Sequence, residues 1–264
     1  MAVNVDTVYK TVLSIINKEQ RGYMTPQEFN RTAAQVQLEI FEQYFDDLNQ
    51  QLRVNQSDYE YSDRIVEIDQ KMSIFKTTGL CTYVANVAGG YFTLPTTDLY
   101  GVTSSLYRLG TLAYKNVYNQ QIGPLEELQK YEFYYIQNSR LTASTTINPT
   151  FFRESNRVVV APSSITSNTS IIANYIRKPL DPIWGFTVGT RGQYIYNPNA
   201  YNPGNPTTLP PVPATGSRNF ELHESEQTRL IIKILIYAGI IIKDPQIVQA
   251  AAQQSQLEEV NSKS

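Results

Sequence analysis

The chain has 264 residues, 41% of them hydrophobic, which is sufficient for one or two domains with a substantial apolar core. The single cysteine, Cys81, excludes an intramolecular disulfide framework, and with the single histidine, His223, it excludes a structural zinc site, which takes three or four Cys and His ligands. The formal net charge of −2 argues against a protein that holds nucleic acid through its phosphates, because such binding depends on clustered Lys and Arg.

The N-terminal residues predict an amphipathic helix over 4–22 rather than a secretion signal. "MAVNVDTVYK" lacks the basic region and apolar stretch of a cleaved signal. Asn4 or Asp6 suits the start of the helix, and Gly22 suits its end. The apolar residues recur at steps of three and four: Val5, Val8, Tyr9, Val12, Ile15 and Ile16.

A second helix begins at the sequence "TPQE". Thr25 is the expected N-cap, Pro26 the first helical residue, and Glu28 completes a capping box. Two apolar stripes follow: Phe29, Ala33, Val36, Ile40, Tyr44 and Leu48 in one, and Leu38, Phe41, Phe45 and Leu52 in the other. So wide an apolar arc predicts a helical bundle, a subunit contact, or both. Residues 62–75, with Ile65, Ile68, Met72 and Phe75 at helical spacing, predict a third helix that faces the same core.

From Thr77 onward the pattern changes to that of strands. Short β-branched runs follow one another at "YFTL", "RVVVAP" and "SIIANYIRKP", and the second is apolar without alternation, as in a strand covered on both faces. One helix is expected within this region over 123–139, with Pro124 at its start and Glu126 and Glu127 in its first turn.

Residues 197–217 hold six of the fourteen prolines and little that could fill a core. A loop of this length is usually functional or disordered, and its prolines make it semi-rigid and extended. Tyr194, Tyr196 and Tyr201 lie in or near it, so we favour a contact arm over an inert linker.

The chain returns to helix over 224–239, with Gly239 expected just beyond the helix end, and again after Asp244 and Pro245. The most apolar run, Leu230 to Ile242, has thirteen residues interrupted by Lys233, whereas a membrane span needs about 20. A buried helix with a short apolar extension is the simpler interpretation. The overall prediction is an α+β fold: a discontinuous helical bundle from residues 1–78 and 222–264, with a β-rich domain inserted at 79–221.

Motifs for catalysis and phosphate binding are missing from the sequence. No G-x-S-x-G elbow accompanies His223, for which a capping or surface role is expected, and neither glycine-rich phosphate-binding motif occurs. Adjacent carboxylates at Asp46-Asp47, Glu126-Glu127 and Glu258-Glu259 lie in predicted helices, where consecutive side chains diverge, so solvated faces are expected. The nineteen tyrosines favour assembly, because tyrosine is enriched at interfaces that form from water.

The order of these elements resembles the head-to-tail adaptors of short-tailed phages, the tail tubular protein A-like connectors, and most closely the ring proteins of crAss-like phages. Three segments carry the resemblance: "INKEQRGYMTPQEFNRTAAQVQLEIFEQYFDDLNQQLR", "GYFTLPTTDLYGVTSSLYRLG" and "FELHESEQTRLIIKILIYAGIIIKDPQIVQAAAQQ". The resemblance implies a virion protein of the head-tail neck, made in the cytoplasm of a host bacterium. It would form a dodecameric ring between the portal and the next tail or ring protein, with a channel through which DNA passes without specific binding.

The same resemblance implies a structural role without enzyme activity, cofactor, metal or membrane, and a C-terminal segment that docks on the portal or on a neighbouring subunit. The expected contact residues are Ile240, Ile241, Ile242, Pro245, Ile247 and Val248 there, Phe41 and Phe45 on the apolar arc, and Tyr196 and Tyr201 near the arm. Two alternatives remain: a capsid or tail decoration or receptor-contact protein that binds through the arm, and a tail-associated glycan hydrolase that uses a carboxylate pair.

Overall fold

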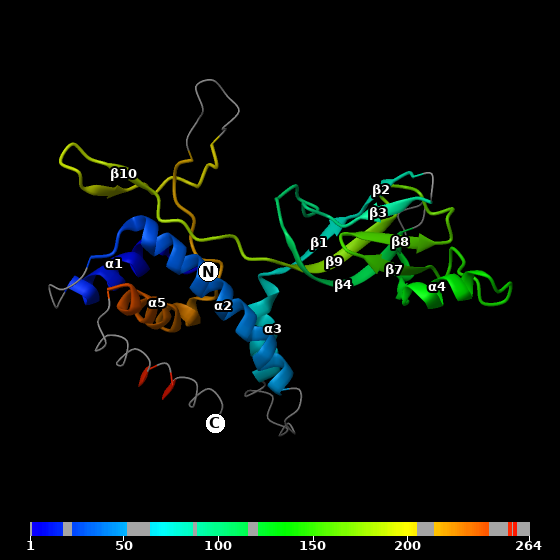
Figure 1. Cartoon of the computed structure of the whole chain (residues 1–264), viewed down its shortest axis with the longest axis horizontal. Coiled ribbons are helices and arrows are strands. Elements are labelled where there is room, and N and C mark those ends of the chain that lie inside the picture. The colour runs from blue at the N-terminus through cyan, green and yellow to red at the C-terminus, as the bar shows by residue number, and fades with distance from the viewer. Residues whose placement is uncertain are drawn as a thin grey trace. The chain divides into compact units, whose positions relative to one another are not determined.

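The computed structural model shows an α+β chain divided into two compact units (Figure 1). The helical unit comprises Met1–Ile74 and Pro179–Ser264, and the β unit comprises Phe75–Lys178. The structure describes residues 2–17, 23–51, 64–86, 89–115, 121–204, 214–242, 253–254 and 256–257.

Helices from both ends of the chain form the helical unit. They are α1 (Val5–Asn17), α2 (Pro26–Gln51), α3 (Arg64–Ser73) and α5 (Gln227–Ile242), the last preceded by the 3-10 helix η2 (Glu224–Glu226). Helix α5 packs against α1 and α2, and α3 packs against α2. The predicted end of the first helix at Gly22 lies outside the described residues, and α1 ends at Asn17 in the part that is described.

The predicted capping box at the start of α2 is confirmed. Oε2 of Glu28 accepts hydrogen bonds from the Thr25 amide at 2.8 Å and from the Thr25 hydroxyl at 2.7 Å. The Glu28 amide donates to Thr25 Oγ1 at 3.3 Å. These hydrogen bonds from Thr25 lower the pKa of Glu28, because they stabilise the charged carboxylate.

The apolar faces of these helices meet in one core. The first stripe of α2 is buried from Phe29 to Tyr44, and so are Phe41 and Phe45 of the second stripe. The apolar run of α5 lies against them through Leu230 and Ile234, which are fully buried. Lys233 is also buried, where its ammonium is paired with Glu39 of α2. The run therefore fills a core, as the sequence indicates.

Helix α5 continues through Gly239 to Ile242, so the predicted helix end at Gly239 is wrong. A glycine inside a helix costs only about 1 kcal/mol relative to alanine. The buried apolar side chains on the same helix offset this cost, because tertiary packing overrides weak local propensity.

The Tyr44 hydroxyl is buried in the helical core and has no hydrogen-bond partner within the described part of the chain. Burial and the nearby Glu226 carboxylate raise the pKa of Tyr44, so this hydroxyl stays protonated. An unsatisfied buried hydroxyl destabilises the fold, so we expect Tyr44→Phe to raise the free energy of unfolding by about 1 kcal/mol. Urea unfolding followed by circular dichroism measures this change, and a loss of stability would show that the hydroxyl has a partner in solution.

Residues 179–221 belong to the helical unit, which corrects the predicted domain boundary at 221. Two extended segments pair through Ile183 and Arg218, whose amides and carbonyls exchange hydrogen bonds of 2.9 and 2.8 Å. The buried Gln37 of α2 binds both segments: its amide nitrogen donates to the Leu180 carbonyl at 2.8 Å and its oxygen accepts from the Glu221 amide at 2.9 Å. A side-chain amide that binds one backbone group of each segment thus fixes these segments on α2.

The β unit consists of two antiparallel-rich sheets. A four-stranded sheet has the order β1 (Lys76–Leu80), β9 (Ile171–Arg177), β4 (Leu106–Lys115), β5 (Gln121–Pro124). A five-stranded sheet has the order β2 (Thr82–Val84), β3 (Tyr91–Thr93), β8 (Arg157–Ala161), β7 (Thr150–Glu154), β6 (Glu126–Glu127). Only the β6–β7 pair is parallel among these described strands.

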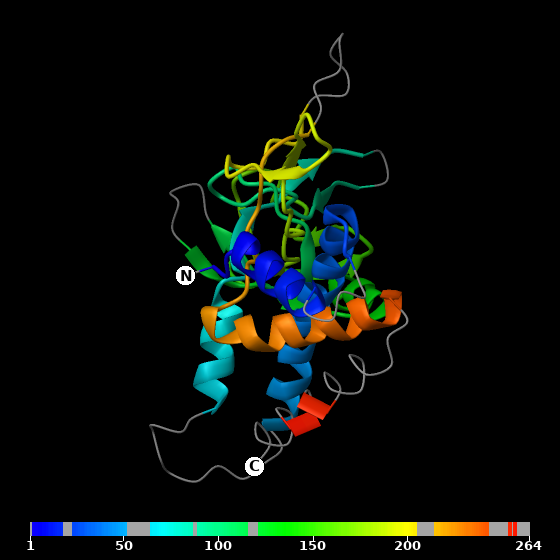
Figure 2. The same cartoon turned by 90° about the vertical axis from the view of Figure 1, so that its left-hand side faces the viewer.

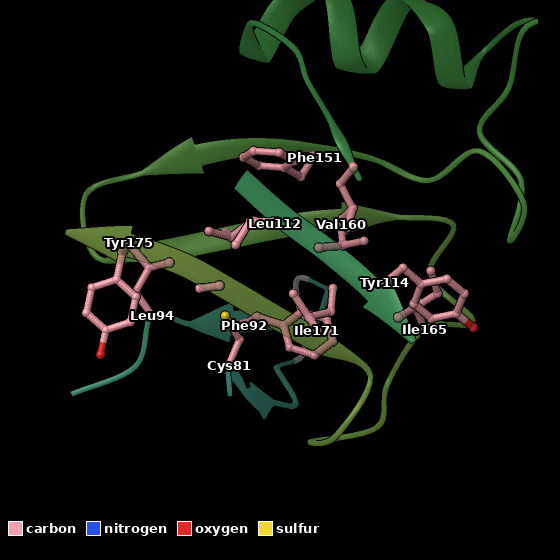
Figure 3. Packing of buried hydrophobic residues seen from close by; sticks show 13 residues of the cluster. Cys81, Phe92, Leu94, Leu112, Tyr114, Phe151, Val160, Ile165, Ile171 and Tyr175 are labelled. Carbon is pink, nitrogen blue, oxygen red and sulfur yellow. The ribbon is translucent and has the colours of Figure 1, made fainter. Parts of the chain in front are cut away.

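Side chains from both sheets meet in one core (Figure 3). Leu112 and Ile171 of the four-stranded sheet meet Phe92, Phe151 and Val160 of the five-stranded sheet there. On the other face of β8, Ala161 belongs to a second cluster with Phe133 of α4 (Lys130–Gln137) and Phe152 of β7. The prediction of a strand covered on both faces at "RVVVAP" is therefore confirmed.

The predicted helix over 123–139 is wrong in its first part. Pro124 ends β5, Glu126 and Glu127 form β6, and α4 begins only at Lys130. The amides of Leu125 and Leu128 donate to the carbonyls of Leu112 and Phe151 at 2.8 Å, so pairing with distant strands replaces the helical hydrogen bonds. The helix starts where the Gln129 amide donates to the Glu132 carboxylate at 3.3 Å.

Cys81 is fully buried between β1 and β2, and burial raises the pKa of its thiol to about 12. The thiolate is the reactive form, so we expect the native thiol to react with a disulfide reagent on the order of 100-fold more slowly than in urea. Absorbance of the released thiol reports the rate. Equal rates with and without urea would contradict the burial of Cys81.

Candidate functional site

The described surfaces best suited to function are protruding apolar elements, one on each unit. The helical unit carries a hairpin of β10 (Phe186–Val188) and β11 (Tyr194–Tyr196), which lies on the side of α1 away from α5 (Figures 1 and 2). A hairpin of two short strands is marginally stable alone, so its position depends on what anchors it.

Trp184 anchors the hairpin to α1 and α2. Its ring lies 4.3 Å from the Tyr9 ring and stacks on the rings of Phe186 and Tyr196 at 6.1 and 5.6 Å. The indole N–H donates to Asp6 at 3.1 Å. The backbone amide and carbonyl of Trp184 bind the Asn30 side chain at 2.8 and 3.3 Å. A tryptophan that is 4% exposed thus connects the base of the hairpin to both helices.

The outer part of the hairpin exposes apolar side chains. Strand alternation places Val188 and Tyr194, which are register partners, on one face, and Ile195 on the other. Val188 is 63% exposed, Ile195 is 49% exposed, and Tyr194 contacts Phe186 edge-on while remaining exposed. We call Val188 and Tyr194, which share one face, the hairpin surface. A β-branched residue opposite an aromatic residue suits a pair of strands but leaves their apolar area in water.

The two ends of the proline-rich loop pair with each other in the described residues. The amides and carbonyls of Asn202 and Thr215 exchange hydrogen bonds of 2.8 and 2.9 Å. Gly216 has a φ of +86°, and a Cβ there would lie 2.3 Å from the Ala200 carbonyl oxygen, so a larger residue cannot fit. The rest of the predicted arm, residues 205–213, lies outside the described residues.

The β unit carries a second ordered apolar element at residues 97–103, between β3 and β4. Oδ1 of Asp98 accepts from the amides of Tyr100 and Val102 at 2.9 and 2.8 Å, and the Asp98 amide donates to the Val102 carbonyl at 2.9 Å. Gly101 takes a φ of +80°, which this turn requires. The turn holds Tyr100 92% exposed, with Leu99 and Val102 exposed beside it. We call Leu99, Tyr100 and Val102 the knob.

Helix α4 presents a third apolar surface. Phe133 packs inward on Phe152 at 4.8 Å, while Tyr131, Tyr134 and Tyr135 are exposed. These three tyrosines of α4 therefore lie at the surface.

The predicted contact residues differ in how far they are exposed. Phe41 and Phe45 lie in the helical core, 0% and 6% exposed, so their predicted role as contact residues is wrong; α3 and α5 cover the broad arc of α2 within the chain. Tyr196 and Tyr201 are half-buried: Tyr196 stacks on Trp184, and the Arg218 guanidinium lies 4.4 Å above the Tyr201 ring. Both rings therefore pack against other residues of the chain and are not fully available to a partner.

The C-terminal contact residues are only partly described. Ile240, Ile241 and Ile242 form the last turn of α5, and Pro245, Ile247 and Val248 lie outside the described residues. The hairpin surface and the knob were not among the predicted contact residues. The sequence "TDLYGV" held a usable signal for the knob, because Asp and Gly in a short apolar stretch predict an exposed turn.

The side chains considered for catalysis have structural explanations. Nδ1 of His223 accepts from the Ser225 amide at 3.3 Å and so caps η2, which confirms its predicted capping role. Asp46 and Asp47 lie on α2, whereas Glu126 and Glu127 lie on the strand β6 rather than on a helix. Glu258 and Glu259 lie outside the described residues. Among the residues that are described, no group of three or more His, Cys, Asp and Glu side chains could hold a metal ion.

No family model matches the sequence, and no curated protein matches it at a significant level. Within the described ranges, no helix is both long enough and apolar enough to cross a membrane.

Proposed function

We propose that the chain is a structural subunit of a phage head-to-tail connector. It forms a homo-oligomeric ring, dodecameric by the resemblance, that joins the portal to the next tail or ring protein in the virion neck. The ring leaves a channel for genome passage, and the subunit acts without catalysis, cofactor or metal. The support from the sequence is the order of the three resembling segments.

The observation that carries the proposal is the pair of rigidly held apolar protrusions, one on each unit. The knob is held by four hydrogen bonds to Asp98, and the hairpin surface is anchored through Trp184. Exposed apolar side chains on a backbone that is already held by hydrogen bonds or packing require little backbone ordering on binding, which favours an assembly interface. A ring needs two different faces on each subunit, and two separate protrusions supply candidates for them.

The C-terminal part of the proposal concerns the portal. Helix α5 is buried in the subunit along most of its length, and the sequence continues beyond Ile242 with Lys243, Asp244 and Pro245. Docking on the portal is therefore assigned to the residues from Ile240 onward.

A binding assay with the portal protein of the same genome tests this function. The full chain, a chain that ends at Lys243, and a full-length Tyr135→Ser control are each titrated against the assembled portal. We expect the full chain and the control to bind equally and the truncated chain to lose binding. If no version binds, the connector function is wrong, and binding of the full chain to intact capsids or host cells would instead favour a decoration or receptor-contact protein.

A further inference from the structure

The two units of the chain carry opposite net charges. The β unit has nine Lys and Arg against five Asp and Glu, a net charge of +4. The helical unit has 13 Lys and Arg against 19 Asp and Glu, a net charge of −6. The net charge of −2 is therefore the sum of a basic β unit and an acidic helical unit.

Each unit also exposes one protruding apolar element with few charges of its own. The knob belongs to the basic β unit, and its single charged residue, Asp98, uses one carboxylate oxygen to hold the turn. The hairpin surface belongs to the acidic helical unit, and Arg191 is the single charged residue of the hairpin from Phe186 to Tyr196. Neither element has the charged side chains that prevent association of exposed apolar area.

Like charges disfavour three of the possible pairings between copies. Contact of one knob with another, or of the knob with the tyrosine surface of α4, would bring two basic units together. Contact of two hairpins would bring two acidic units together. Contact of a knob with a hairpin pairs a unit of charge +4 with one of charge −6, and this complementarity steers association toward it rather than toward those three pairings.

We infer that the knob of one copy docks against the hairpin surface of a second copy of this chain. Tyr100 supplies the central aromatic side chain, with Leu99 and Val102 beside it, and Val188 and Tyr194 supply the apolar surface that receives it. The contact uses different faces of the two copies, so repetition closes a ring or continues as a chain. The inference rests on the proposed ring and specifies which surfaces form it.

Two matched variants test the contact. The knob variant carries Leu99→Ser and Tyr100→Ser, and the hairpin variant carries Val188→Thr and Tyr194→Thr, which place β-branched residues in the strands. Tyr135→Ser on α4 is the control for loss of an exposed tyrosine. Circular dichroism and amide hydrogen exchange verify that each variant keeps the fold.

Native mass spectrometry then counts the copies in free assemblies and on the portal. We expect each variant alone to lose assembly, with subunit affinity weaker by about 30-fold or more, as for a central aromatic contact, while the control assembles normally. An equal mixture of the two variants retains one intact knob-hairpin pair, so it should give dimers and nothing larger. Assembly of the unmixed chain should weaken as salt is added.

Rings formed by either variant alone, or a mixture that gives no dimers, would overturn the inference. A mixture that gives no dimers would mean that the knob binds a different protein or another part of its own chain. The connector function is judged separately, because both variants keep the residues assigned to the portal. Rings of either variant on the portal would refute the contact and leave the connector standing, whereas an unmodified chain that does not bind the portal would refute the connector.

Discussion

Replacement of Trp184 by alanine is expected to lower the free energy of unfolding of the helical unit by about 3–5 kcal/mol. The substitution removes a 4% exposed side chain that touches Tyr9 of α1 and both strands of the hairpin. It also leaves the Asp6 carboxylate without the indole donor at 3.1 Å. Since Trp184 stacks on a residue of each strand and a two-stranded hairpin is marginally stable alone, the strands should separate well before the rest of the unit unfolds.

Amide hydrogen exchange measures this effect separately in the hairpin and in the β unit. In Trp184→Ala we expect the amides of the β10–β11 hairpin to lose protection, while those of β4 and β9 in the β unit keep theirs. Trp184→Phe is the matched control, because it retains an aromatic ring and should lose less than half as much stability. Unchanged protection of the hairpin in Trp184→Ala would show that the anchor lies elsewhere.

Replacement of Glu226 by glutamine should cost about 2–4 kcal/mol of stability in the helical unit. The Glu226 carboxylate is buried and lies 3.0 Å from the Lys71 ammonium of α3 and 3.5 Å from the Arg229 guanidinium of α5. The substitution leaves two cations without their shared anion. We place the cost below the range for fully buried pairs because Lys71 and Arg229 keep 19% and 25% of their side-chain exposure.

We also expect the effect of Glu226→Gln to depend on pH, because of the pairing between Glu226 and Lys71. Burial acts to lower the pKa of Lys71, but the pairing with Glu226 and Glu67 outweighs it, so the pKa is raised above its ordinary value of 10.5. A raised pKa in the folded state means that the pair stabilises the fold below pH 10.5 and loses this contribution as the pH rises through the folded pKa. Glu67→Gln is the control, since Glu67 is 64% exposed and its loss should cost less than about 0.5 kcal/mol. Urea unfolding at neutral and alkaline pH measures both variants, and equal losses from Glu226→Gln and Glu67→Gln would contradict the structural role of Glu226.

Local chemistry predicted the elements that depend on near neighbours. The capping box at Thr25 and Glu28 and the cap at His223 use residues within three positions of one another. The strand at 157–161 could be predicted because its apolar residues leave no polar face for solvent. These features need no knowledge of distant parts of the chain.

Features that depend on distant residues could not be predicted in this way. Residues 125–128 contain good helix formers, but the carbonyls of Leu112 and Phe151 hold them in strand pairing. Residues 179–221 join the helical unit because Gln37 binds their backbone, and no local pattern indicates such a contact. The same limit explains Phe41 and Phe45, since a broad apolar arc looks alike whether α3 and α5 or a second subunit covers it.

The measurement that tests the connector most directly is electron microscopy of the chain mixed with the portal protein of the same genome. We expect averaged images of a ring coaxial with the portal, with an open channel along the shared axis. Portals without an added ring, or copies of the chain bound only around the outer rim with no ring on the axis, would contradict the connector function.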